Sequence, residues 1–326
     1  MRRTGRFLVA ASVAVTATAG VVSWLFQNEL GRMRVAARMG SLIASPQAGA
    51  IEYADRGVGV PLLSIHGSGG GFDQGLANAA DLAGEGFRVI APSRFGYLRT
   101  PVPEDVSPAA QADAHAKLLS ELKIPRAVVV GVSAGARSAV ELALRRPDMV
   151  SALILVVPGL YAPDSPVSIG PSWGSRFAFR VVNVGGDFAW WLAETAAPSM
   201  LIRFLGVPPD LVAAAPQAER DRVMGIVRSV EPLSWRFAGI NIDSTPDLHE
   251  APLGRIDAPT LIVSARDDLF NTLPAAQFSA SKIVGAELVV YDTGGHLLVG
   301  RGEDVRAAVR AFLARAGVTP SPEAGP

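Results

Sequence analysis

The sequence has no cysteine among its 326 residues. This absence excludes disulfides, thiolate nucleophiles and cysteine-ligated metal sites, and it leaves the redox compartment open. Charged residues are also few, at 18%, and the 30 basic side chains balance the 30 acidic ones. Nucleic-acid-binding proteins carry a basic patch or stripe, and the body of this chain has no dense run of lysine or arginine. We therefore expect no nucleic-acid partner.

Recognisable metal and nucleotide motifs are missing as well. Four scattered histidines form no H-E-x-x-H pattern, and no G-x-x-x-x-G-K-[ST] loop exists. The glycine-rich run Gly67–Gly71 completes no G-x-G-x-x-G frame, because Phe72 or Gln74 stands where the last glycine is needed. We expect no metal and no cofactor, and a nucleotide-dependent oxidoreductase is disfavoured.

Hydrophobic residues are abundant, at 49%, which allows a large core. At the N-terminus, three arginines precede the uncharged stretch Phe7–Phe26, which as a helix would be about 30 Å long, enough to cross a bilayer. We expect an uncleaved signal anchor with the domain outside the cytoplasm. The alternatives are a signal peptide with hydrophobic region Phe7–Val15, cleaved at Ala17–Ala19, and an amphipathic segment of a cytosolic protein.

Short apolar runs alternate with helical patterns after a predicted linker at Gly40–Gly49. Runs that are apolar at successive positions are typical of strands covered on both faces of a parallel sheet. The predicted strands are Pro61–Ile65, Phe87–Ala91, Ala127–Val132, Ala152–Val157, Pro259–Ser264 and Glu287–Tyr291. The predicted helices are Ser107–Lys123, with Ser107 as a cap, Ala134–Arg146 and Gly302–Arg315. This order predicts an α/β fold with a mostly parallel sheet flanked by helices.

The alternation stops between Tyr161 and Leu253. This stretch is rich in aromatic residues, has helical patches and shows no clear strand. We predict a mainly helical cap over the carboxyl ends of the strands, in which each aromatic packs the cap and together they roof an apolar pocket. The expected domains are an anchor or signal segment with linker at 1–40, a core at 41–160 and 254–318, a cap at 161–253 and a flexible tail at 319–326.

The pentapeptide Gly131–Gly135 fits G-x-S-x-G and joins a predicted strand to a predicted helix. A serine at so sharp a turn is held in a strained backbone, with its hydroxyl above the sheet at the positive end of a helix. Ser133 is therefore the candidate nucleophile. A second turn, at His66–Gly71, also follows a strand and can present backbone amides to a developing negative charge. The expected oxyanion donors are the amides of Ser68, aided by Gly69, and of Ala134.

A base and an orienting acid are expected at the same edge of the sheet. His296, just after the strand Glu287–Tyr291, is the candidate base. His66 is expected to hold its own loop, His115 to lie at the surface, and His249 to face solvent. The acid is expected from Ser264–Asp268, where Asp268 is preferred over Asp267, with Asp164 a third candidate. Its role would be to hold the imidazole tautomer and stabilise imidazolium.

Nucleophile elbow, glycine-rich loop, acid and late Gly-His occur in the order Ser, Asp, His over residues 61–315. In these features the chain resembles a capped member of the α/β-hydrolase superfamily. The resemblance implies a Ser133, His296 and Asp268 triad, with Ser68 and Ala134 in the oxyanion hole. The loop Ser93–Thr100 departs from the Asp-x-x-Gly-x-Gly-x-Ser type of many relatives, so no subfamily is implied. A serine nucleophile also disfavours epoxide hydrolases and haloalkane dehalogenases.

The sequence thus favours a serine hydrolase that acts through an acyl-enzyme on a small to medium apolar ester or related acyl compound. A carbon–carbon bond hydrolase with the same triad is the enzymatic alternative. A membrane-tethered ligand-binding protein that has lost turnover is the alternative from another class. Neither the substrate nor the oligomeric state follows from the sequence.

Overall fold

The computed structural model describes residues 2–45, 49–163, 186–244 and 248–319, with side chains of the first helix from residue 13. The strands there are β1 (Leu42–Ala44), β2 (Ile51–Arg56), β3 (Val60–Ile65), β4 (Phe87–Pro92), β5 (Ala127–Val132), β6 (Val150–Val156), β7 (Thr260–Ala265) and β8 (Glu287–Tyr291). The helices include α1 (Arg2–Ala36), α2 (Phe72–Leu82), α3 (Pro108–Glu121), α4 (Ala136–Arg145), α6 (Pro198–Phe204), α7 (Pro209–Ala214), α8 (Gln217–Ser229), α9 (Phe237–Ser244), α10 (Leu273–Lys282) and α11 (Gly302–Arg315).

The described strands form one eight-stranded sheet in the order β1-β2-β4-β3-β5-β6-β7-β8. The strands from β4 to β8 in this order pair in parallel, whereas β1 and β2 are antiparallel additions at one edge. The prediction of an α/β fold with a mostly parallel sheet is confirmed. Each of the six predicted strands is present, with ends that differ by at most two residues.

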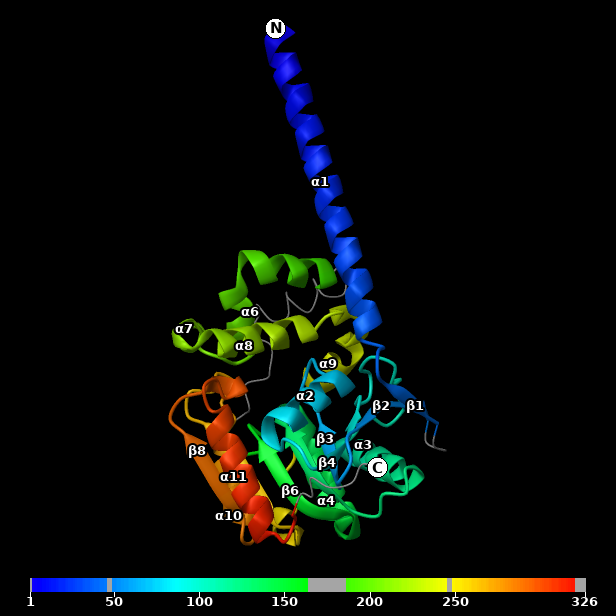
Figure 1. The fold of residues 1–326 in the computed structure, drawn as a ribbon, viewed down its shortest axis with the longest axis vertical. Helices are drawn as coiled ribbons and strands as arrows, with labels where there is room; N and C mark the ends of the chain where they lie inside the picture. The colour runs from blue at the N-terminus through cyan, green and yellow to red at the C-terminus, as the bar shows by residue number, and fades with distance from the viewer. Residues whose placement is uncertain (1, 46–48, 164–185, 245–247, 320–326) are drawn as a thin grey trace.

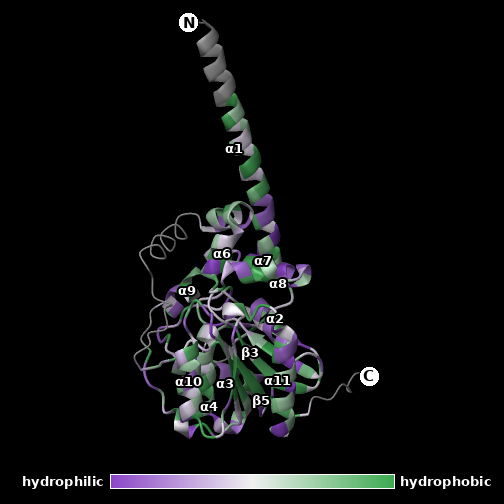
Figure 2. Cartoon of the chain, turned by 90° about the vertical axis from the view of Figure 1, so that its left-hand side faces the viewer, coloured by the Kyte–Doolittle hydropathy of each residue, from purple (hydrophilic) through white to green (hydrophobic). Residues whose placement is uncertain are grey.

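Helices cover both faces of the sheet, which explains why its central strands are apolar at successive positions. Along β5, Val129 packs into the cluster that includes residues of α3, α4 and α10. Its neighbours Val128 and Val130 point to the other face and pack with residues of α2 and α11. Figure 2 shows β3 and β5 as hydrophobic strands between these flanking helices.

One helix cap was predicted correctly, whereas four helices and strands outside the cap were not predicted. The Ser107 hydroxyl accepts a hydrogen bond from the Ala110 amide at 3.1 Å, so the predicted cap of α3 is confirmed. Four elements were not expected, namely α2, α10, β2 and β1. The last of these lies in the predicted linker, because Leu42–Ala44 pairs with Ile51–Tyr53 at the sheet edge.

The cap, as we call residues 161–253, is helical where it is described, with residues 186–196 and α6 to α9. In Figure 1 these helices lie on one side of the sheet and its flanking helices. Backbone hydrogen bonds join the cap to loops that follow parallel strands: Gly239 N donates to Gly96 O after β4, and Leu269 N after β7 donates to Gly206 O. The cap therefore covers the carboxyl end of the sheet.

The described aromatic residues of the cap pack it together. Trp190 is buried, donates its indole N–H to Val227 O at 3.0 Å and packs edge-on against Phe204. Trp191 lies against Phe26 of α1. Trp173, Phe177, Phe179 and the third acid candidate Asp164 lie outside the described residues. For Trp190 and Trp191, packing within the cap and against α1 is the observed role.

The helix α1 begins at Arg2 and extends away from the rest of the molecule (Figure 1). Among the side chains that the structure describes, no helix is long and apolar enough to cross a membrane. From residue 13 onward, α1 soon reaches the polar residues 27–29, which limits its apolar length. The predicted anchor at 7–26, and the membrane partner expected through it, thus gain no support; residues 7–12 lie outside the described side chains.

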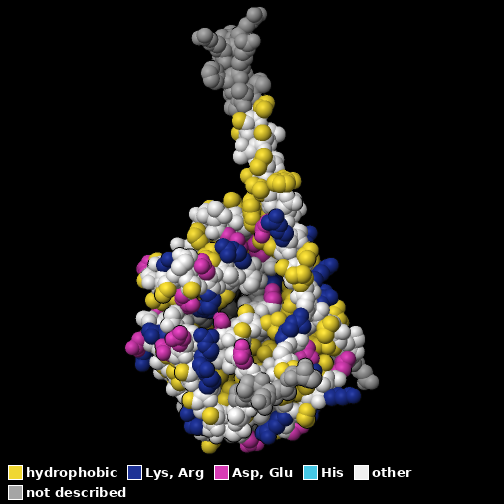
Figure 3. All heavy atoms as spheres, viewed as in Figure 1, with side chains coloured by type: hydrophobic (Ala, Val, Ile, Leu, Met, Phe, Trp, Pro, Cys, Tyr) yellow, Lys and Arg dark blue, Asp and Glu magenta, His cyan; other side chains and the backbone are white. Residues whose placement is uncertain are grey.

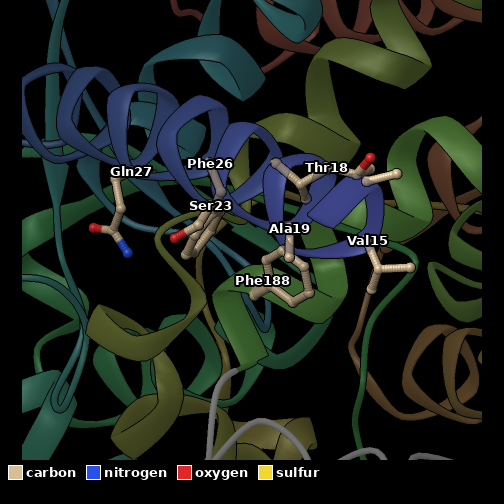
Figure 4. A pocket seen from close by; sticks show the side chains of 9 residues that line it. Val15, Thr18, Ala19, Ser23, Phe26, Gln27 and Phe188 are labelled. Carbon is tan, nitrogen blue, oxygen red and sulfur yellow. The ribbon is translucent and has the colours of Figure 1, made fainter. Parts of the chain in front are cut away.

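The C-terminal half of α1 packs on the cap. Phe26 and Leu30 are buried, and the Phe26 ring meets Phe188 edge-on at 5.2 Å between centroids. Figure 3 shows hydrophobic side chains gathered along α1 just above the globular part. An open groove of about 750 Å³ lies between α1 and Phe188 (Figure 4). Its lining includes none of the predicted site residues.

Candidate active site

Ser133 occupies a strained turn between β5 and α4. Its φ is +52°, in the left-handed region that non-glycine residues rarely adopt and that costs about 1–3 kcal/mol. The flanking glycine is required by space, because a Cβ on Gly135 would lie 2.5 Å from the carbonyl oxygen of His66. Ser133 also opens the helical turn Ser133–Gly135 that leads into α4. The predicted strand–serine–helix turn is present.

His296 follows β8 in a short helical turn, Gly295–Leu297, and is 9% exposed. Its Nδ1 lies 2.8 Å from Oδ2 of Asp268, which follows β7. Of the two adjacent carboxylates, Asp268 is thus the one that faces the imidazole. A carboxylate that binds Nδ1 fixes the ring orientation and the tautomer in which Nε2 can accept a proton.

Asp268 is held by more than the histidine. It also accepts hydrogen bonds from the Phe270 amide at 2.9 Å and from the Thr272 hydroxyl. Burial on its own would raise the pKa of Asp268, but the facing His296 and these donors outweigh burial and hold the pKa below its usual value. The side chain is therefore an ionised carboxylate at neutral pH.

Asp267 binds the backbone of the same histidine loop. Its Oδ1 accepts from the Gly295 amide at 2.7 Å, and its Oδ2 accepts from the Gly294 amide at 3.2 Å. The two neighbouring carboxylates thus have different partners: Asp267 binds the backbone of the His296 loop, and Asp268 binds the imidazole ring. The sequence offered Asp267 only as an alternative acid; the two glycines before His296 were the available signal of this contact.

The candidate oxyanion turn lies against the nucleophile. A Cβ added to Gly67 would come within 3.1 Å of Ser133 Cβ, so the two segments touch. The Gly69 amide donates to the Tyr97 hydroxyl at 3.2 Å and is therefore already engaged. Among the hydrogen bonds of the described residues, none uses the Ser68 amide as a donor. Ser68, rather than Gly69, keeps an amide available.

The pattern of the α/β-hydrolase fold family matches residues 60–302 of this sequence. The chain belongs to the α/β-hydrolase family. Similar known proteins include the putative carbamate hydrolase RutD of Klebsiella pneumoniae, which is 30% identical over 249 residues, 73% of this hydrolase and 85% of that protein. The 2-hydroxymuconate semialdehyde hydrolase of Pseudomonas putida is 27% identical over 270 residues, 80% of this chain and 90% of that one.

Solved structures agree with the fold. An alpha/beta hydrolase fold protein from Nakamurella multipartita superposes with a TM-score of 0.61 at 30% identity. The match covers 85% of this α/β-hydrolase and 99% of that chain. The family match and this structure together establish the fold family and leave the substrate open.

Direct contacts join some of the predicted residues in this hydrolase. His296 is hydrogen-bonded to Asp268, and Ser133 abuts the turn that carries Ser68. Among the hydrogen bonds of the described residues, none joins the Ser133 hydroxyl to His296. Ala134 follows the nucleophile directly and is buried.

Of the three remaining histidines, His66 and His249 meet their expectations and His115 does not; His249 is exposed, as expected. In His66 both ring nitrogens are engaged, since Nε2 accepts the Arg94 amide at 3.0 Å and Nδ1 lies 2.7 Å from Gly67 O. Burial and the nearby Arg94 charge lower its pKa, which fits a neutral residue that holds its own loop. The expectation that His115 lies at the surface is wrong: it is fully buried between α3 and α4, and burial lowers its pKa to about 3.

Proposed function

We propose that this α/β-hydrolase is a serine hydrolase in which Ser133 is the nucleophile, His296 the base and Asp268 the orienting acid. One observation carries the proposal: a serine with φ +52° follows β5 at the edge where the buried His296–Asp268 pair follows β7 and β8. A strained serine between strand and helix and an oriented imidazole are the two parts that nucleophilic acyl transfer needs.

In this proposal His296 Nε2 removes the proton of Ser133 Oγ while the oxygen attacks the substrate carbonyl. The amides of Ser68 and Ala134 stabilise the resulting oxyanion. The tetrahedral intermediate collapses to an acyl-enzyme, and His296 gives its proton to the leaving group. Water then attacks the acyl carbon, His296 takes its proton, and the bond to Ser133 breaks as that proton returns to Oγ. Asp268 stays ionised throughout and stabilises the imidazolium.

An apolar ester or related acyl compound of small to medium size is the substrate class that we propose. The aromatic and aliphatic composition of the cap supports it, as does the name of the Klebsiella pneumoniae relative, a putative carbamate hydrolase, whose substrate class also has an acyl carbon. The match to that relative covers 85% of its length, so it extends over most of the catalytic domain.

Carbon–carbon bond hydrolysis is a second candidate. The similarity to the 2-hydroxymuconate semialdehyde hydrolase of Pseudomonas putida favours it, because that match covers 90% of the relative. The same three residues would serve: water adds to the carbonyl carbon, the adjacent carbon–carbon bond breaks, and the departing carbanion takes up the proton that His296 carries. Parallel assays with p-nitrophenyl acyl esters and with a vinylogous 1,5-diketone acid separate the two candidates. An esterase should have a much higher kcat/KM for the esters, and a carbon–carbon bond hydrolase a much higher kcat/KM for the diketone acid.

The test of the triad is covalent labelling. A fluorophosphonate probe should modify the wild-type chain at Ser133, and Ser133→Ala should lose both the adduct and p-nitrophenyl ester hydrolysis. Ser279→Ala is the matched control, because Ser279 is fully buried and its hydroxyl has no hydrogen-bond partner in the described structure. Labelling elsewhere than Ser133, or equal ester hydrolysis by Ser133→Ala, would refute the assignment.

A further inference from the structure

The turn at Gly67–Gly70 is fixed by side chains on several sides. The Gly67 amide donates to Gln74 Oε1 at 2.9 Å, and the Gly69 amide donates to the Tyr97 hydroxyl at 3.2 Å. The Gly70 carbonyl accepts from Arg236 Nη1 at 2.6 Å. Every one of these contacts leaves the Ser68 amide unused, so together they set the direction in which that N–H points.

Tyr97 links this turn to the cap. It is fully buried, accepts the Gly69 amide and donates its own proton to Asp243 Oδ2 at 2.5 Å. Burial and the charge of Asp243 raise the pKa of Tyr97, so the hydroxyl keeps the proton that it donates. The hydrogen bonds therefore run in one direction, from Gly69 through Tyr97 to Asp243.

Asp243 lies on α9 and is 2% exposed. It forms a two-pronged ion pair with Arg94, with contacts of 2.8 and 2.6 Å, and Arg94 also donates to Gly67 O at 3.1 Å. Burial would raise the pKa of Asp243, but the Arg94 guanidinium more than offsets burial and keeps the carboxyl ionised. The Asp243 carboxylate of the cap is thus linked to the turn at two points, to Gly69 through Tyr97 and to Gly67 through Arg94.

Arg236 makes a second, separate connection. Its side chain is fully buried, and besides Gly70 O it binds Asp73 at 2.6 and 3.2 Å. Because Arg236 and Asp243 lie more than 140 residues after the groups that they bind, these contacts form only when the cap is seated on the core. Breaking any of them leaves a buried charge or amide without its partner, which is strongly unfavourable.

We propose that Tyr97, Asp243 and Arg236 are positioning residues for the oxyanion turn, so that seating of the cap directs the Ser68 amide toward the reacting carbonyl oxygen. The inference rests on the proposed function. It assigns the cap a part in transition-state stabilisation in addition to covering the site, and it concerns residues that do not touch substrate.

The first test is Tyr97→Phe, which keeps the ring and removes the acceptor of the Gly69 amide. With p-nitrophenyl butyrate, kcat should fall by about 10- to 100-fold, below the loss of about 10²–10³ seen when an oxyanion donor is removed outright. KM should change by less than about twofold, because the lost contact acts on the transition state. Tyr53→Phe is the control: Tyr53 is buried on β2, its hydroxyl has no hydrogen bond within the described residues, and kcat should stay unchanged.

A second readout separates positioning from general damage. An alkyl trifluoromethyl ketone forms a tetrahedral adduct whose oxygen occupies the oxyanion position, and its affinity should fall in Tyr97→Phe by the same factor as kcat/KM. The affinity for a non-reacting alcohol of the same chain length should stay constant. Arg236→Lys keeps the charge but not the planar guanidinium, and it should show the same pattern. It replaces Tyr97→Phe as the test if that variant does not fold.

The outcomes are distinguishable. If the wild-type enzyme neither hydrolyses the ester nor reacts with a fluorophosphonate, the proposed function fails and this inference fails with it. If the wild type is active and folded Tyr97→Phe or Arg236→Lys matches it in kcat and in adduct affinity, the inference alone is overturned. A rise in KM at constant kcat also overturns it, because that pattern reports ground-state binding.

Discussion

The carbonyl oxygen of Gly206 accepts the backbone amide of His296 at 3.0 Å and that of Leu269 at 3.1 Å. Gly206 belongs to the cap, Leu269 follows the acid Asp268, and His296 is the candidate base. One carbonyl in the cap therefore joins the loops that carry two members of the proposed triad. A displacement of this part of the cap would move both loops.

Gly206→Ala should damage the site. Gly206 has φ +80°, and an added Cβ would lie 2.7 Å from both His296 Cβ and the Phe270 ring. We expect a stability loss of about 1–3 kcal/mol from backbone strain and overpacking. We also expect kcat to fall more than 10-fold, since a displacement of about 1 Å at catalytic groups costs on the order of 10²-fold. Thermal unfolding and ester kinetics measure the two effects.

Gly225→Ala is the control for that variant. Gly225 lies within α8, and a Cβ there meets nothing within 4 Å. Alanine is favoured over glycine inside a helix by about 0.5–1 kcal/mol, so this variant should be slightly more stable and equally active. Wild-type activity in Gly206→Ala would show that the contact between the cap and the His296 loop is not needed.

The two adjacent aspartates should give different kinetic defects. Asp268→Asn removes the charge that holds His296 and favours the wrong tautomer, and kcat should fall by about 10⁴-fold, as when a triad aspartate is replaced by asparagine. Asp267→Asn keeps one acceptor for the Gly294 and Gly295 amides. Its kcat should fall only about tenfold, and its free energy of unfolding should fall by about 1 kcal/mol. If the larger loss followed Asp267→Asn, the two roles would have to be exchanged.

Acid should remove the stabilisation that Asp268 provides. Its pKa is lowered in the folded chain, so its contribution is present above the unfolded carboxyl value of about 3.9 and is lost as pH falls through the lower folded value. The difference in unfolding midpoint between wild type and Asp268→Asn should therefore narrow between about pH 6 and about pH 2. Thermal melts at intervals across this window measure it. A difference that stays constant would mean that the ionised form of Asp268 is not preferentially stabilised by folding.

Alkaline pH should destabilise the cap through Glu231. This carboxyl is 3% exposed, both its oxygens lack a hydrogen-bond partner in the described structure, and its pKa is raised to about 9 by burial and then by Glu194. A raised acid contributes stability that is complete below its unfolded pKa of about 4.3 and is lost as pH rises toward 9. Asp187 and Glu29 of α1 also face it and add to the repulsion.

Glu231→Gln should raise the unfolding midpoint at pH 8 by a few degrees and flatten its decline between pH 5 and pH 9, because the amide resembles the protonated acid. Glu85→Gln, at an exposed position, should leave the profile unchanged. Thermal melts over this pH range decide the matter. A profile of Glu231→Gln parallel to that of the wild type would show that Glu231 is not the group responsible.

The parallel core was predictable because its strands are buried on both faces and are therefore apolar at successive positions. The antiparallel strand β2, between β1 and β4, was not, since it includes the charged residues Glu52, Asp55 and Arg56. Glu52 is fully buried there and accepts hydrogen bonds from Ser41, Ser93 and Arg99, partners that only the fold brings together. The local sequence pattern does not show that these hydrogen bonds offset the cost of burying the Glu52 carboxylate.

The site shows the same division. Ser133 and His296 lie in short motifs whose local backbone requirements are visible in the sequence, and the choice of Asp268 over Asp267 followed from its distance past the strand. The contacts of Gly206, Tyr97 and Asp243 depend on how the cap seats on the core, and no short-range pattern encodes that. His115 was misjudged for another reason: its spacing from Leu118 and Leu119 places it on the buried face of α3, and its polarity was given more weight than that spacing.

The way α1 meets the cap sets where the chain can be shortened. Phe26 and Leu30 are buried there, and the guanidinium of Arg38 stacks on Trp235 at 4.6 Å. A recombinant protein that begins near Val21 retains these contacts. One that begins at Leu42 strips the cover from Trp235, the immediate neighbour of Arg236, and so weakens the support of a turn more than 160 residues away in the sequence.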